Sequence, residues 1–207
     1  MPERSAAPAS SRLQAWAVRH PRAFRHLLNW YPCYRGTGGK VTFIAEDWSE
    51  MRVRLKLNWR TRNYVGTIYG GSLYACVDPH FMFMLMHRLG PEYTVWDKAA
   101  SIRFRRPGRT ALTAVCRMPD AEVAEVQRLL ESEPKVDRTY NVDLVDAGGV
   151  VHATVEKVVN IRRGAPPGPV AVAVEAPLAA AQQAPNALPG ASPKPQKAGP
   201  RGASGKA

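Results

Sequence analysis

The sequence has few cysteines, few acidic residues and no long apolar run. Its three cysteines are Cys33, Cys76 and Cys116, and their spacing matches neither a metal site nor a disulfide framework. No run of about 18 apolar residues occurs, so no membrane-spanning helix is expected. The first ten residues lack the apolar stretch of a secretory signal. Together these absences favour a cytoplasmic protein with reduced thiols.

The shortage of acids leaves a large positive charge. There are 17 Asp and Glu against 29 Lys and Arg, a net charge of +12. Such a surplus favours anionic partners: nucleic acid, anionic lipid or a phosphate-bearing cofactor. No helix-turn-helix, zinc-finger or aromatic-interleaved basic pattern occurs, so no specific nucleic acid is expected. Weak, salt-sensitive association of a charged tail with a nucleic acid or membrane surface is one hypothesis.

Composition divides the chain into three parts. Residues 1–35 form an N-terminal lead, disordered at first and helical from residue 11, with Pro21 splitting that helix. Residues 164–207 hold nine of the 18 prolines, and such a segment cannot bury enough apolar surface to offset its ordering entropy. We expect a disordered, basic C-terminal tail there. Residues 36–163 are predicted to form one folded domain.

Hydrophobic periodicity predicts the elements of that domain. In residues 51–57, Met51, Val53 and Leu55 alternate with basic residues, the period of a strand with one buried and one basic face. An amphipathic helix is expected over residues 119–132. Strands are expected over residues 40–45, 51–57, 94–104, 110–118, 136–145 and 150–161.

Residues 72–89 are almost wholly apolar. They predict a helix buried on nearly every face, bent where Pro79 removes one hydrogen bond and ended by Gly90 and Pro91. One such helix among antiparallel strands is an α+β arrangement in which a sheet wraps a long central helix.

The stretch that carries chemistry is residues 63–71, followed by Asp78. Gly70 and Gly71 precede the predicted helix, so their N–H groups lack an intrahelical acceptor and could hold a carbonyl oxygen that develops negative charge. Asp78 is the only acid of residues 51–91. A lone buried carboxylate requires a partner or a function, such as that of a general base. An ordinary turn, with Asp78 facing a solvent gap, is the alternative.

Five residues stand at the spacing of a known pattern: Asn63, Gly66, Gly70, Gly71 and Asp78. The pattern resembles the hotdog superfamily, specifically the PaaI-like acyl-CoA thioesterases. Residues 101–107 resemble that family's strand ending in an Arg-Pro turn, and residues 25–163 look closest to a hotdog group of unknown function. Tyr69 stands where the family has histidine.

The resemblance implies a hotdog fold and a role for each matched residue. Asp78 would activate water or attack the thioester, and the Gly71 N–H, with that of Gly70, would bind the carbonyl oxygen. Asn63 would position water or substrate, and the Tyr69 hydroxyl could donate in place of histidine. Family members dimerise and build each site from both subunits, so a homodimer or a dimer of dimers is expected.

Further substrate contacts are expected from the loop and from a basic group near residue 104. These are Gly66, Thr67, Gly70, Lys98, Arg103, Arg105 and Arg106. The four basic residues would hold the phosphates of coenzyme A or the phosphopantetheine of a carrier protein; solvated strand-face charges are the alternative. Coenzyme A would be part of the substrate, so neither a cofactor nor a metal is expected.

The leading hypothesis is therefore a hydrolase of acyl-CoA or acyl-carrier thioesters. The alternative is a non-catalytic hotdog protein that binds acyl thioesters or lipids, which the replacement of the family's histidine by Tyr69 motivates.

Overall fold

The computed structural model describes residues 20–164. The expected disorder over residues 1–10, the expected helix over residues 11–19 and the expected tail beyond residue 164 lie outside this range. In chain order the elements are α2 (Pro21–Trp30), α3 (Pro32–Gly36), β1 (Gly39–Ile44), β2 (Glu50–Leu55), α4 (Gly70–Ala75), α5 (His80–Leu89), β3 (Tyr93–Phe104), β4 (Leu112–Arg117), α6 (Asp120–Ser132), β5 (Lys135–Val145) and β6 (Val151–Arg163).

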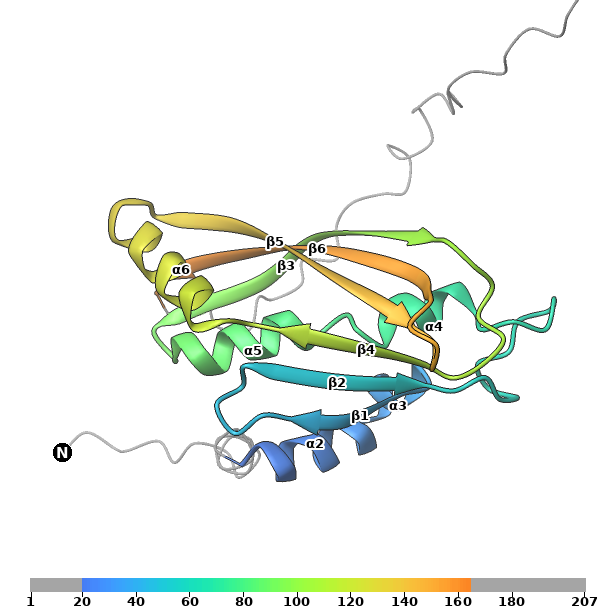
Figure 1. Cartoon of the computed structure of the whole chain (residues 1–207). Helices are drawn as coiled ribbons and strands as arrows, with labels where there is room; N and C mark the ends of the chain where they lie inside the picture. The colour runs from blue at the N-terminus through green and yellow to red at the C-terminus, as the bar shows by residue number, and fades with distance from the viewer. Residues whose placement is uncertain (1–19, 165–207) are drawn as a thin grey trace, which may run out of the picture. The chain divides into compact units, whose positions relative to one another are not determined.

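The strands form one six-stranded antiparallel sheet in the order β1-β2-β4-β5-β6-β3. The sheet curves around α4 and α5, and α6 lies at one end beside β5 (Figure 1). The predicted α+β arrangement is confirmed, and each predicted strand is present with bounds that differ by a few residues.

The period-two pattern of β2 sets which face is buried. Met51, Val53 and Leu55 are buried, whereas Arg52 and Arg54 between them are exposed. The apolar side chains point at the helices because successive residues of a strand face opposite sides of the sheet. The predicted buried and basic faces are therefore confirmed.

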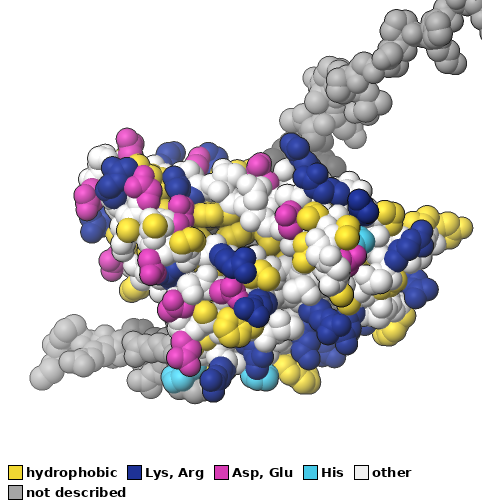
Figure 2. All heavy atoms as spheres, in the orientation of Figure 1, with side chains coloured by type: hydrophobic (Ala, Val, Ile, Leu, Met, Phe, Trp, Pro, Cys, Tyr) yellow, Lys and Arg dark blue, Asp and Glu magenta, His cyan; other side chains and the backbone are white. Residues whose placement is uncertain are grey.

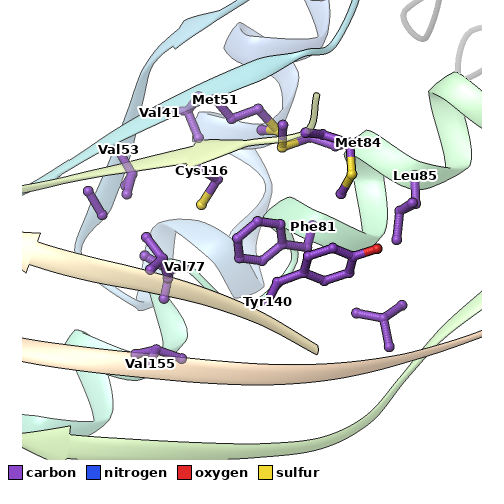
Figure 3. Packing of buried hydrophobic residues seen from close by; sticks show 14 of the residues in the cluster. Val41, Met51, Val53, Val77, Phe81, Met84, Leu85, Cys116, Tyr140 and Val155 are labelled. Carbon is purple, nitrogen blue, oxygen red and sulfur yellow. The ribbon is translucent and has the colours of Figure 1, made fainter. Parts of the chain in front are cut away.

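The core lies between the sheet and α5. Phe81, Met84 and Leu85 of α5 are buried there, and the ring of Phe81 stacks on Tyr140 of β5 with centroids 4.9 Å apart (Figure 3). Full burial of a phenylalanine stabilises a fold by about 1.5–3 kcal/mol. Such contacts fix the helix against the sheet and so fix the position of the turn that precedes α5.

The expected single helix over residues 72–89 is interrupted. Pro79 has no N–H to donate to the carbonyl four residues earlier, and the His80 N–H donates to Val77 O instead. The carbonyl of Cys76 accepts the buried hydroxyl of Tyr34 at 2.9 Å. The chain therefore forms two helices, α4 and α5, with Asp78 in the turn between them.

The expected burial of this segment on nearly every face holds except at one residue. Met84 is fully buried, whereas Met86 is 44% exposed, because the sheet curls over one side of α5 (Figure 1).

The two edges of the sheet differ. At the β1 edge, the side-chain amide of Asn29 in α2 donates to Val41 O and accepts from Val41 N–H. This helix begins at Pro21, as predicted, and a short helix follows it that was not expected. At the other edge, β3 pairs with β6 alone among residues 20–164. None of the helices in that range is long and apolar enough to cross a membrane.

Candidate active site

The loop before α4 is closed by Asn63. The Asn63 side chain donates to Thr67 Oγ1 and accepts from Thr67 N–H, both at 2.9 Å. Gly66 adopts a left-handed φ of 81°, which glycine tolerates without steric penalty. Both polar ends of the Asn63 amide thus bond within the loop, and Asn63, Gly66 and Thr67 together form a fixed turn.

Gly70 and Gly71 begin α4. A Cβ atom on Gly71 would lie 2.4 Å from Cε1 of Tyr69, and one on Gly70 would lie 3.0 Å from Cζ of Phe104. Two exposed aromatic rings therefore lie directly against this main chain, and a side chain at either glycine would displace one of them. At the start of a helix, the N–H groups have no intrahelical acceptor.

Asp78 has two hydrogen-bond donors. Its Oδ1 accepts the Tyr74 hydroxyl at 2.5 Å and the Lys157 ammonium at 2.6 Å, and its side chain is 40% exposed. The prediction of a lone, buried acid is wrong, because β6 brings in a cation from 79 residues further along the chain. Asp78 therefore has a charged partner, Lys157.

Lys157 is the residue that the sequence reasoning missed. Its side chain is 1% exposed, and its Nζ also lies 3.0 Å from Asp97 Oδ2. Val155, Lys157 and Val159 share the inward face of β6. The available signal was a lysine at a strand position where the alternation predicts an apolar, inward-facing residue. Lysine is almost never fully buried unless it is paired.

Burial and hydrogen bonds shift the pKa values of Lys157, Asp97 and Tyr74. Burial by itself lowers the pKa of Lys157, but its hydrogen bonds to Asp78, Asp97 and Tyr74 outweigh burial and raise it to about 12. Burial raises the pKa of Asp97, and the nearby charge of Asp78 adds to that rise, whereas Lys157 opposes it. Burial and the hydrogen bond to Asp78 raise the pKa of Tyr74. Lys157 is thus a permanent cation at neutral pH.

Two hollows border the start of α4, and the first of them also borders this cluster. One of about 460 Å³ lies between α4 and β3, where Gly70, Gly71 and Tyr74 face Ile102 and Phe104. The second, of about 370 Å³, is lined in part by Asn63, Thr67, Gly70, Arg105 and Arg106. The predicted main-chain donors and the tyrosine that holds Asp78 therefore border the same hollow.

Gly71 and Asp78 of one chain are nevertheless well separated. They lie seven residues apart, a spacing of about 10 Å in a continuous helix, and the turn at residues 76–79 comes between them.

The four predicted basic residues do not all line one hollow. Lys98 forms an ion pair with Asp137 at 2.5 Å. Arg103 and Arg105 border a separate hollow of about 210 Å³ that also includes Glu156. Only Arg105 and Arg106 lie beside the loop that carries Gly70.

No group of three or more His, Cys, Asp or Glu side chains within residues 20–164 could hold a metal ion. His80 is fully buried, and burial lowers its pKa to about 4. His87 packs against Trp48 with ring centroids 3.6 Å apart. Asp78 and its neighbours are the titratable cluster beside the hollow that Gly70 and Gly71 border.

A six-stranded antiparallel sheet curled around a central helical segment is the hotdog fold, and solved structures share it. The structure is similar to a probable thioesterase from Pseudomonas aeruginosa, with a TM-score of 0.63 and 17% identity over 69% of this chain and 95% of that one. A Chlorobaculum tepidum protein of unknown function has a TM-score of 0.58 and 13% identity, over 72% of this chain and 99% of that one. For a thioesterase from Haemophilus influenzae the TM-score is 0.52 and the identity 12%, over 69% of this chain and 90% of that one.

Residues 20–161 match the family described as a domain of unknown function, DUF4442, and the chain belongs to that family. The predicted hotdog group of unknown function is confirmed. A comparison with curated protein sequences gives no match.

Proposed function

We propose that the protein hydrolyses acyl thioesters, of acyl-CoA or of an acyl carrier, with Asp78 as the general base. The observation that carries this proposal is the setting of the Asp78 carboxylate. Its Oδ1 is held by Tyr74 and Lys157, its side chain is 40% exposed, and Tyr74 lines an open hollow. A half-exposed acid fixed through one oxygen can direct the other at a reactant, as a general base requires.

In the proposed reaction, Asp78 takes a proton from a water molecule as the water oxygen attacks the thioester carbonyl carbon. The Gly71 N–H, with that of Gly70, stabilises the negative charge that forms on the carbonyl oxygen. The C–S bond then breaks, and the proton passes from Asp78 to the leaving thiolate. The products are a carboxylic acid and a thiol. Asn63 acts here through the shape of its loop.

The distance between Gly71 and Asp78 favours a site shared by two copies of the chain. The hollow that contains Gly71 borders β3, the edge strand that pairs on one side only within residues 20–164. Pairing of β3 with β3 of a second copy would bring an Asp78 from one chain towards the Gly71 of the other. We therefore propose a homodimer as the active unit.

The test is hydrolysis of a panel of acyl-CoAs, followed with a thiol reagent. For Asp78→Asn we expect kcat to fall by about 10²–10⁴, the usual contribution of a general base. The matched control is Glu131→Gln, which neutralises an exposed acid of α6 and should leave the rate within a factor of two. Thermal unfolding of both variants establishes that they are folded.

A folded Asp78→Asn protein with an unchanged rate would remove Asp78 from the mechanism. A wild-type protein with no turnover on any acyl chain length would refute hydrolysis of acyl-CoA.

A second candidate is a non-catalytic acyl-thioester-binding protein. The observation that favours it is the engagement of Asp78 by Lys157, together with Tyr69 in the place of the family's histidine. It predicts saturable acyl-CoA binding, measured by calorimetry, without release of thiol. Asp78→Asn should then leave turnover at zero while changing the affinity.

A further inference from the structure

The net positive charge of the domain is concentrated in its first part. Residues 20–77 contain nine Lys and Arg and three acids, whereas residues 78–164 contain 13 Lys and Arg and 12 Asp and Glu. The three acids, Glu46, Asp47 and Glu50, lie in the turn between β1 and β2 and at the start of β2. Outside that turn, α2, α3, β1, the rest of β2 and the loop that leads to α4 carry only basic charges.

Residues 20–77 also carry most of the exposed large hydrophobic side chains. Eight of the twelve lie there: Leu27, Trp30, Tyr31, Phe43, Trp59, Tyr64, Val65 and Tyr69. Trp30 is 72% exposed and Trp59 is 87% exposed. Single exposed apolar side chains need no explanation, but a concentration of them beside one sign of charge indicates a binding surface.

A hollow of about 330 Å³ is lined by both basic and aromatic side chains. Its lining includes Trp30, Arg35, Lys40 and Arg60 and the main chain of Gly38 and Gly39. The Arg35 guanidinium lies 5.3 Å from the centre of the Trp30 ring. Aromatic and cationic groups therefore meet at one place on the surface.

The cations of this hollow lack acidic partners. None of Arg35, Lys40 and Arg60 forms an ion pair with an acid among residues 20–164. Lys40 also stands directly opposite Arg54 in the β1–β2 ladder, and like charges in such a pair destabilise a sheet. An external anion would relieve that repulsion.

We name the surface formed by Trp30, Arg35, Lys40, Arg54, Trp59 and Arg60 the cationic face. Figure 2 shows dark-blue Lys and Arg side chains gathered where α3 and the adjoining ends of β1 and β2 lie in Figure 1, with yellow side chains beside them.

We propose that the cationic face docks on a membrane surface that contains anionic phospholipid. Headgroup phosphates would occupy the hollow beside Arg35, Lys40 and Arg60. Trp30 and Trp59 would lie at the level of the headgroups, where amphipathic rings are most stable. A single-stranded nucleic acid could use the cations and the rings. The exposed aliphatic side chains of Leu27 and Val65 in the same part of the chain favour a lipid surface instead. This inference does not depend on thioester hydrolysis.

The experiment is flotation of the full-length protein with vesicles of phosphatidylglycerol and phosphatidylcholine, or of phosphatidylcholine alone. We expect binding to the anionic vesicles that weakens as salt rises. The double variant R35Q/R60Q should bind about 30-fold more weakly, since each basic residue near an anionic membrane contributes about a fivefold change in binding. The matched control K135Q/R163Q removes two exposed charges from β5 and β6 and should change binding by less than threefold.

A second variant separates docking from simple charge attraction. Tryptophan emission should shift to shorter wavelength when vesicles are added, and W30S/W59S should remove most of that shift. No binding to anionic vesicles, or an equal loss in R35Q/R60Q and K135Q/R163Q, would overturn the proposal. So would binding to a single-stranded oligonucleotide that is tighter than vesicle binding and is lost in the same two variants.

Discussion

Lys157 is a charged side chain within an apolar layer, and three polar groups compensate for its burial. Its neighbours along the inward face of β6 are Val155 and Val159. An isolated ammonium there would be strongly destabilising, but Asp78, Asp97 and the Tyr74 hydroxyl all lie within 3.2 Å of its Nζ. The lysine therefore fixes the acid that we propose as the general base.

Replacement of Lys157 by methionine tests this arrangement. The variant leaves Asp78 and Asp97 facing each other without a cation. Loss of one partner of a buried pair costs about 3–5 kcal/mol; because both carboxylates are partly exposed, we expect about 2 kcal/mol in urea unfolding. Lys135→Met, an exposed lysine of β5, should change the free energy of unfolding by less than about 0.5 kcal/mol.

The difference between wild type and Lys157→Met should also depend on pH. The pKa of Lys157 is raised in the fold to about 12 from 10.5, so its contribution to stability is fully present below pH 10.5 and is lost as the pH rises towards 12. The gap between the two urea midpoints should therefore narrow over that range. A gap that stays constant to pH 12 would show that the ammonium charge is not what stabilises the fold.

At the scale of elements, the start of β1 and the end of α4 approach each other closely. A Cβ atom on Gly39 would lie 2.6 Å from Cys76 Cβ and 3.2 Å from its Cα. Neither atom is the end of a flexible side chain, so neither can yield without moving the main chain. This contact sets the position of the turn that carries Asp78.

Gly39→Ala should therefore destabilise the fold by about 1–3 kcal/mol, as overpacking of a filled space does. The matched control is Gly36→Ala at the end of α3, where an added Cβ meets nothing within 4 Å. That substitution should be neutral or stabilise by up to about 1 kcal/mol. The measurement is the urea midpoint of both variants, and equal effects at the two glycines would contradict the proposed contact.

At the scale of the whole molecule, the two edges of the sheet differ in whether a helix covers them. The edge at β1 is covered by α2 through Asn29. The edge at β3 is twelve residues long, and Trp96 and Phe104 on it are exposed. Long uncovered edges are templates for pairing with another chain, which supports the proposed homodimer.

Charges placed on this edge should separate the two copies. In a symmetric antiparallel pair, added lysines of the two chains come close to each other and repel. We expect A99K/S101K to convert a dimer to a monomer in analytical ultracentrifugation and to abolish turnover with it. The control A124K/Q127K adds the same charge to the exposed face of α6 and should leave both mass and rate unchanged. A dimeric A99K/S101K protein would place the interface elsewhere.

The sequence by itself determined the order of the strands, the buried face of the strand at residues 51–57 and the stretch around Gly70, Gly71 and Asp78. These follow from local rules: side chains alternate along a strand, Pro79 cannot continue a helix, and glycine permits close approach. The pattern of residues 63–78 also pointed to the hotdog fold.

Only the tertiary structure decided what Asp78 contacts. The sheet order places β6 next to β3, so that Lys157 contacts both Asp97 and Asp78, which lie 60 and 79 residues earlier in the chain. The tertiary structure also pairs Lys98 with Asp137. Ion pairs between distant segments depend on strand order and register, and no local pattern of residues encodes these.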